Sequence, residues 1–153
     1  MHNMKYRIQS LMLGAALTLT SVIGFATEPF STVVVVYKSA TCSCCSGWVK
    51  HMRDNGFNMM TQNVQDVSQY KERANLPEDI RSCHTAFVDG YAIEGHVPAS
   101  DIKRMLTQKP DIRGLAVPGM PIGSPGMEYG DRKDRYQVIS YTKDGVKTVY
   151  SSY

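Results

Sequence analysis

The chain has 153 residues, of which 42% are hydrophobic, and a formal net charge of +3. This length suits a single domain, and so small a charge gives no electrostatic reason to expect a nucleic acid or an anionic membrane surface as a partner. Four cysteines are present, and their placement is the most informative feature of the sequence.

The N-terminal segment has the pattern of a secretory signal peptide. Lys5 and Arg7 precede an apolar, uncharged stretch that ends in small residues, as a signal peptidase requires. We therefore predict a signal peptide over residues 1–26 and one mature domain over residues 27–153, exported to the periplasm and free of the membrane after cleavage. Loss of the two basic residues lowers the net charge to +1. An uncleaved anchor is the alternative, because the apolar stretch is close to the minimum of about 18 residues that spans a bilayer.

Strands and helices are predicted to alternate in the first half of the domain. Residues 32–38 form a continuous β-branched run, typical of a strand buried on both faces. The cysteine cluster follows, and then a helical stretch that Gly56 ends. Residues 58–64 can form a second strand, and a second helix, capped by Asp66 or Ser68, can come next.

A hairpin replaces a crossover in the second half. Asp89-Gly90 between two apolar runs predicts the hairpin, and Pro98 opens a further helix. Residues 114–130 contain five glycines and three prolines and predict an irregular loop. Residues 137–141 and 146–150 predict a terminal hairpin. The order β-α-β-α-β-β-α predicts an α/β domain of the thioredoxin-like class, with a Gly/Pro/Met-rich loop and a C-terminal β-hairpin.

The cysteines are placed where a sheet and a helix would meet. Cys42, Cys44 and Cys45 fall within four residues, between the first predicted strand and the first helix. Backbone N–H groups and the helix dipole favour the thiolate at such a position. Cys83 precedes the third predicted strand, which neighbours the first strand in this order. We therefore expect Cys83 to approach the other three cysteines.

Four interpretations of the cysteines remain open at this point. Structural disulfides are usual in exported proteins, but only the Cys42–Cys45 pair would avoid a strained ring. A thiol–disulfide oxidoreductase would use the same Cys42 and Cys45 as its catalytic pair. A structural zinc site would combine thiolates with His84. A soft-metal site, above all for Cu(I), is favoured because clustered sulfur donors prefer soft ions.

Additional donors lie near the cysteines in sequence or in the predicted loop. Met120 and Met127 could close over the thiolates, since thioethers prefer Cu(I) to zinc. His84 adjoins the fourth cysteine, and His96 follows the predicted hairpin, so both are candidate ligands. His51 is about 9 Å along the helix from the cluster, and we expect it to pack against the core or a ligand rather than to bind metal.

Several segments together carry a resemblance to a known family. They are Cys42-Ser43-Cys44-Cys45-Ser46-Gly47-Trp48, Ser82-Cys83-His84-Thr85-Ala86, Glu94-Gly95-His96-Val97-Pro98, Leu115-Ala116-Val117-Pro118-Gly119-Met120-Pro121 and Gly123-Ser124-Pro125-Gly126-Met127-Glu128. They resemble a family of exported, thioredoxin-like predicted metal-binding proteins that includes the copper-resistance proteins of the CopG type. The resemblance runs from about Val33 to Tyr150.

This resemblance implies a periplasmic copper protein whose four cysteines hold Cu(I), with a thiolate-bridged multinuclear cluster as one form. It also implies copper ions, and other copper-handling proteins of the periplasm, as partners. Thioredoxin-type oxidoreductases place a proline before the third strand, where this chain has Cys83, and this difference favours metal binding over disulfide chemistry.

We therefore expect a copper-binding protein of copper resistance or homeostasis. The alternatives are a thiol or copper oxidoreductase that uses Cys42 and Cys45, and a zinc-stabilised domain. The expected copper ligands are Cys42, Cys44, Cys45 and Cys83, with His84, Met120, Met127 and His96 as additional candidates.

Overall fold

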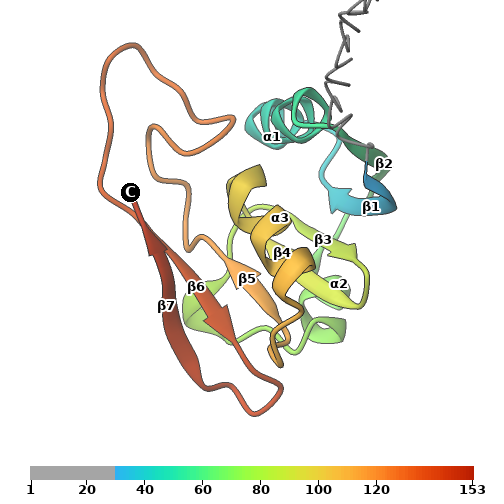
Figure 1. Ribbon diagram of the computed structural model, residues 1–153. Coiled ribbons are helices and arrows are strands. Elements are labelled where there is room, and N and C mark those ends of the chain that lie inside the picture. Colours follow the sequence, from blue (N-terminus) through green and yellow to red (C-terminus); the bar gives the residue numbers. More distant parts are fainter. Residues whose placement is uncertain (1–29) are drawn as a thin grey trace, which may run out of the picture.

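The computed structural model describes the backbone of residues 30–153 and the side chains from residue 32 onward (Figure 1). The predicted signal peptide, residues 1–26, lies outside these described residues. Within them, no helix is long and apolar enough to cross a membrane.

The described residues form an α/β domain with one seven-stranded sheet and three α-helices. The elements are β1 (Phe30–Lys38), α1 (Ser43–Asp54), β2 (Phe57–Asn63), α2 (Ser68–Arg73), the short 3-10 helix η1 (Glu78–Ile80), β3 (Thr85–Val88), β4 (Tyr91–Glu94), α3 (Ala99–Gln108), β5 (Gly114–Ala116), β6 (Gln137–Tyr141) and β7 (Lys147–Ser152). The strands lie in the order β2-β1-β3-β4-β5-β6-β7. The predicted order of strands and helices through α3 is confirmed, as is the terminal hairpin.

The larger core lies between one face of the sheet and helices α1 and α3. Val34 and Val36 of β1 are fully buried there with Trp48 of α1 and Met105 of α3. A smaller core, which includes Tyr141, covers the other face beside α2 and η1. Burial of apolar side chains on both sides of the sheet is the main stabilising contribution to this architecture.

The burial of β1 differs from the prediction. Val34, Val36 and Lys38 are buried, but Val33 is 38% exposed and Tyr37 is only half-buried. The expectation of a strand buried on both faces was therefore wrong for one face. The short helix α2 covers that face incompletely, mainly through the ring of Tyr70, which stacks on the ring of Tyr37 with 3.7 Å between centroids.

The predicted irregular loop is also shorter than expected, because its first three residues form β5. This strand pairs parallel with β4 and antiparallel with β6, and so joins the terminal hairpin to the sheet. Gly114 is required there, since an added Cβ would collide with the carbonyl oxygen of Ala92. A strand of three residues is too short to show a periodicity in the sequence. The remaining loop, between β5 and β6, extends back towards α1 (Figure 1).

Candidate metal centre

The cysteine cluster begins at the N-terminal end of α1, as predicted. Cys42 is the N-cap residue, and its Sγ accepts a hydrogen bond of 3.4 Å from the backbone N–H of Cys45. Sulfur thus satisfies one of the N–H groups that have no partner within the helix. Cys45 is fully buried against the core, whereas Cys42 and Cys44 remain partly accessible.

Cys42 and Cys45 form a disulfide, whereas Cys44 and Cys83 are free thiols. Among the three clustered cysteines, this is the one pair that the sequence allows without a strained ring. The structure therefore shows an oxidised form of the cluster. A two-electron reduction of this disulfide, with uptake of two protons, gives the form with four thiols.

Cys83 approaches the other three cysteines, as the strand order predicted. The Sγ atoms of all four cysteines lie within 4.8 Å of one another. The pairing of β3 with β1 produces this proximity, because it sets the segment before Thr85 beside the end of β1. Burial, with a smaller contribution from the neighbouring Cys44, raises the pKa of the Cys83 thiol to about 11.

Two histidines contact the thiol of Cys83. Its Sγ lies 3.1 Å from Nε2 of His96 and 3.4 Å from Nδ1 of His84. Both rings are fully buried, and this burial is the main reason that the pKa of each lies below its usual value. Cys83, His84 and His96 thus form a second set of candidate ligands that shares its thiol with the first.

The two loop methionines occupy different positions. Sδ of Met120 lies 3.8 Å from Sγ of Cys44, so the loop brings this thioether to the cysteines. Met127 lies with Cys44 in the lining of an open cavity of about 600 Å³. Both methionines therefore lie near Cys44, which is a free thiol and, like Cys83, partly accessible.

A contact between two glycines, which the local sequence pattern does not predict, holds this loop against α1. Gly126 has φ +84°, and a Cβ there would collide with the backbone N of Trp48 and the carbonyl oxygen of Cys44. A Cβ on Gly47 would likewise lie 3.0 Å from Cα of Gly126. A glycine inside a predicted helix was the available signal, since it marks a close approach of another backbone.

The other residues noted near the cluster have packing roles. His51 accepts a hydrogen bond of 3.1 Å from the backbone N–H of Ala99, at the start of α3. Trp48 donates from Nε1 to the carbonyl of Val97 at 2.9 Å, and its ring lies 4.5 Å from that of His84. The predicted packing role of His51 therefore fits its position.

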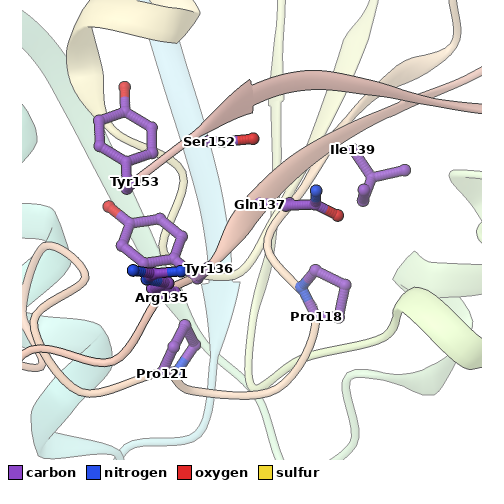
Figure 2. Close-up of a pocket in the computed structure, with 8 residues that line it drawn as sticks. All are labelled: Pro118, Pro121, Arg135, Tyr136, Gln137, Ile139, Ser152 and Tyr153. Atoms are coloured by element: carbon purple, nitrogen blue, oxygen red, sulfur yellow. The ribbon is translucent and has the colours of Figure 1, made fainter.

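A further cavity, of about 530 Å³, lies between the start of the β5–β6 loop and the terminal hairpin (Figure 2). It is lined by Pro118, Pro121, Arg135, Tyr136, Gln137, Ile139, Ser152 and Tyr153. None of these residues is a cysteine, histidine or methionine. This cavity therefore offers no donor that a soft metal prefers.

Fold and site together define an α/β protein with a thiol-rich candidate metal centre, and comparisons with known proteins give the family. The family model described as "Protein of unknown function, DUF411" matches residues 80–127. Two solved structures titled copper resistance protein CopG, Form 2 and Form 1, are each 46% identical and have TM-scores of 0.77 and 0.76. Each match covers 82% of this chain, and 99% and 98% of the respective CopG chain. No curated protein matches the sequence. This chain belongs to the DUF411 family, which includes the CopG proteins.

Proposed function

We propose that this protein binds Cu(I) in the periplasm and acts in copper resistance or homeostasis. The observation that carries the proposal is the convergence of the four cysteine Sγ atoms within 4.8 Å, in a chain 46% identical to proteins named for copper resistance. An all-sulfur ligand set favours a soft ion such as Cu(I). The proposed ligands are Cys42, Cys44, Cys45 and Cys83 in their reduced form.

The spacing of the sulfur atoms suits this role. Two thiolates on one ion lie up to about 4.6 Å apart, twice the metal–sulfur distance of about 2.3 Å known for zinc. The four Sγ atoms, none more than 4.8 Å from another, are therefore close enough to share an ion. The bonded sulfurs of Cys42 and Cys45 must first be separated, so reduction of their disulfide is the chemical change that loading requires. Four thiols in so small a volume also allow more than one copper ion to be bridged.

The thioredoxin-like class, the cellular location and the partners are parts of the same proposal. The element order and the arrangement β2-β1-β3-β4, with β3 antiparallel to β1, support a thioredoxin-like fold. The periplasmic location rests on the predicted signal peptide over residues 1–26. Copper ions are the proposed ligand, and other periplasmic copper-handling proteins are the proposed exchange partners.

A thiol–disulfide oxidoreductase is the second candidate, and the Cys42–Cys45 disulfide favours it. In that reaction the Cys42 thiolate would attack a substrate disulfide, because Cys42 is the more accessible of the pair. The Cys45 thiolate would then attack Cys42 in the mixed disulfide. The substrate leaves as a dithiol with two electrons, and the Cys42–Cys45 disulfide is regenerated.

Competition with a Cu(I) chelator under anaerobic, reducing conditions distinguishes these functions. We expect more than one Cu(I) per chain and a marked loss of copper on Cys83→Ser. All four cysteines of the chain belong to the cluster, so no cysteine remains for a control substitution. A second metal, Zn(II), titrated in the same way, serves as the control instead. Tight zinc binding without a preference for copper would overturn the proposal. Catalysed insulin reduction that survives both Cys44→Ser and Cys83→Ser would instead support the oxidoreductase.

A further inference from the structure

A buried ion pair contacts Ser82, the residue that precedes Cys83 of the candidate metal centre. Nζ of Lys71, in α2, lies 2.5 Å from Oε1 of Glu94, the last residue of β4, and the two side chains are 7% and 0% exposed. Buried charges are costly unless each is both paired and hydrogen-bonded. Lys71 meets this condition, since its ammonium also donates to the carbonyl of Ser82 at 2.9 Å and to Oγ1 of Thr85 at 3.3 Å.

Glu94 contacts the same two residues as its partner. Its Oε1 accepts from the backbone N–H of Ser82 at 2.5 Å, and its Oε2 accepts from the hydroxyl of Thr85 at 2.7 Å. Both backbone polar groups of Ser82 are thus bound by the ion pair. Ser82 immediately precedes Cys83, so these bonds fix the path of the backbone on which the Cys83 thiol is carried.

Ser82 also connects the ion pair to the loop between β5 and β6, which carries Met120. Oγ of Ser82 donates a hydrogen bond to the carbonyl of Gly119, the residue before Met120. Met120 in turn places its Sδ 3.8 Å from Sγ of Cys44. Two sulfur atoms that reach the cluster from outside α1, those of Cys83 and Met120, therefore share one anchor.

We propose that Lys71 and Glu94 are positioning residues, which hold Cys83 and Met120 at the cluster through their bonds to Ser82. This inference rests on the proposed copper binding for its functional meaning. A buried ion pair is weak evidence of stability, because apolar residues of similar volume often serve stability equally well. An apolar pair could not form the directional hydrogen bonds that Lys71 and Glu94 make to the backbone carbonyl and N–H of Ser82.

Disulfide trapping tests the position of Cys83 without any metal. In protein that keeps the Cys42–Cys45 disulfide, diamide oxidises the Cys44 and Cys83 thiols to a disulfide. The two thiols lose two electrons and two protons, which the diazene bond of diamide takes up to become a hydrazine. We expect Glu94→Gln and Lys71→Met to slow this trapping about tenfold, since reaction of two thiols depends on their relative placement.

A second buried carboxylate provides the control. Asp101 is 4% exposed and accepts bonds from Ser151 Oγ at 2.7 Å and Tyr153 Oη at 2.9 Å, which fasten the C-terminal end to α3. Asp101→Asn perturbs a buried hydrogen-bonded carboxylate of the same kind, but one whose hydrogen-bond partners lie in α3 and the C-terminal segment and not at the cysteines. In this variant we expect the Cys44–Cys83 disulfide to form at the same rate as in the unchanged protein, whatever the substitution does to the midpoint of thermal unfolding.

Chelator competition on the reduced proteins gives the functional readout. We expect Glu94→Gln and Lys71→Met to weaken Cu(I) binding about tenfold, in the range found when residues that orient metal ligands are changed. An unchanged rate of disulfide trapping in both Glu94→Gln and Lys71→Met would overturn the inference. So would a rate that falls equally in Asp101→Asn. If Glu94→Gln does not fold, trapping in Lys71→Met tests the inference. That variant loses the bond from Lys71 to the carbonyl of Ser82 but keeps the bonds that Glu94 accepts from Ser82 and Thr85. If the unchanged protein fails to bind Cu(I), the proposed function falls, while trapping still tests the positioning.

Discussion

Nε2 of His96 lies 3.1 Å from Sγ of Cys83, while Nδ1 of the same ring lies 2.7 Å from the carbonyl oxygen of Pro125. A carbonyl oxygen can only accept, so Nδ1 carries a proton and donates it to Pro125. Burial, which lowers the pKa of His96, favours the neutral ring. The lone pair of Nε2 is therefore directed at Cys83, as in metal-binding histidines whose other nitrogen is held by a carbonyl.

His96→Asn should weaken Cu(I) binding about tenfold, because asparagine can retain a donor to Pro125 but cannot place a nitrogen at the position of Nε2. Chelator competition under anaerobic conditions measures the effect. His51→Gln is the matched control, since His51 also accepts a hydrogen bond through Nε2, but from the backbone of Ala99. Equal affinities for His96→Asn and the unchanged protein would exclude a role of His96 in the site.

Met120→Leu should also weaken Cu(I) binding about tenfold, since leucine keeps the volume but removes the soft sulfur donor beside Cys44. Met60→Leu is the control for a methionine of equal accessibility, because Met120 is 49% and Met60 50% exposed, and Met60 lies on β2. Both affinities are measured by the same competition. A loss of similar size in the Met60 variant would show that the Met120 result does not report the site.

Alkylation of Cys83 in metal-free protein should be slow at neutral pH and should rise about tenfold per pH unit, because only the thiolate reacts. The pKa of Cys83 is raised to about 11, chiefly by burial, so this rise should continue beyond pH 9. Copper must release the Cys83 proton on binding, and its apparent affinity should therefore increase with pH over the same interval. Iodoacetamide labelling with peptide mass spectrometry measures the rate. A plateau below pH 9 would contradict this prediction.

Acid should destabilise the fold through His84. Burial holds the pKa of this histidine well below its ordinary 6.5, so the folded protein leaves it neutral while the unfolded chain protonates it. The free energy of unfolding is then unaffected above the unfolded pKa and falls as pH drops below about 6.5, by up to about 1.4 kcal/mol per pH unit. Urea unfolding between pH 5 and 8 measures this slope.

His84→Phe supplies the comparison, because phenylalanine stays neutral at every pH. Nε2 of His84 is buried and has no hydrogen-bond partner among the described residues, so this nitrogen gives up no bond in the variant. We expect a shallower loss of stability in acid than for the unchanged protein. Identical slopes would assign the acid sensitivity to other groups.

Gly126→Ala should lower the free energy of unfolding by about 1–3 kcal/mol, because it combines a strained positive φ with a collision against the backbone of α1. Gly145→Ala is the control, since Gly145 has φ +79° but no atom within 4 Å of its added Cβ. The difference between the two variants in urea unfolding isolates the contact of the loop with α1. Equal losses would show that this contact contributes nothing beyond backbone strain.

Local patterns were sufficient to predict much of the domain. The β-branched run of β1, the Asp89-Gly90 turn and the proline before α3 each act over a few residues, and each element occurs where the sequence predicts it. β5 was missed because a three-residue strand has no periodicity, and the partly exposed face of β1 depends on how much of the sheet α2 covers.

The sequence by itself determined the order of the elements through α3, the position of three cysteines at the start of α1, and the expectation that Cys83 would join them. All of these follow from local propensity and one strand order. Only the tertiary structure decided which other groups surround Cys83. The contacts with His96 and Met120, and the anchoring of Ser82 by Lys71 and Glu94, join segments that are distant in the chain. Their formation depends on sheet register and on the packing of the loop against α1, which no local pattern encodes.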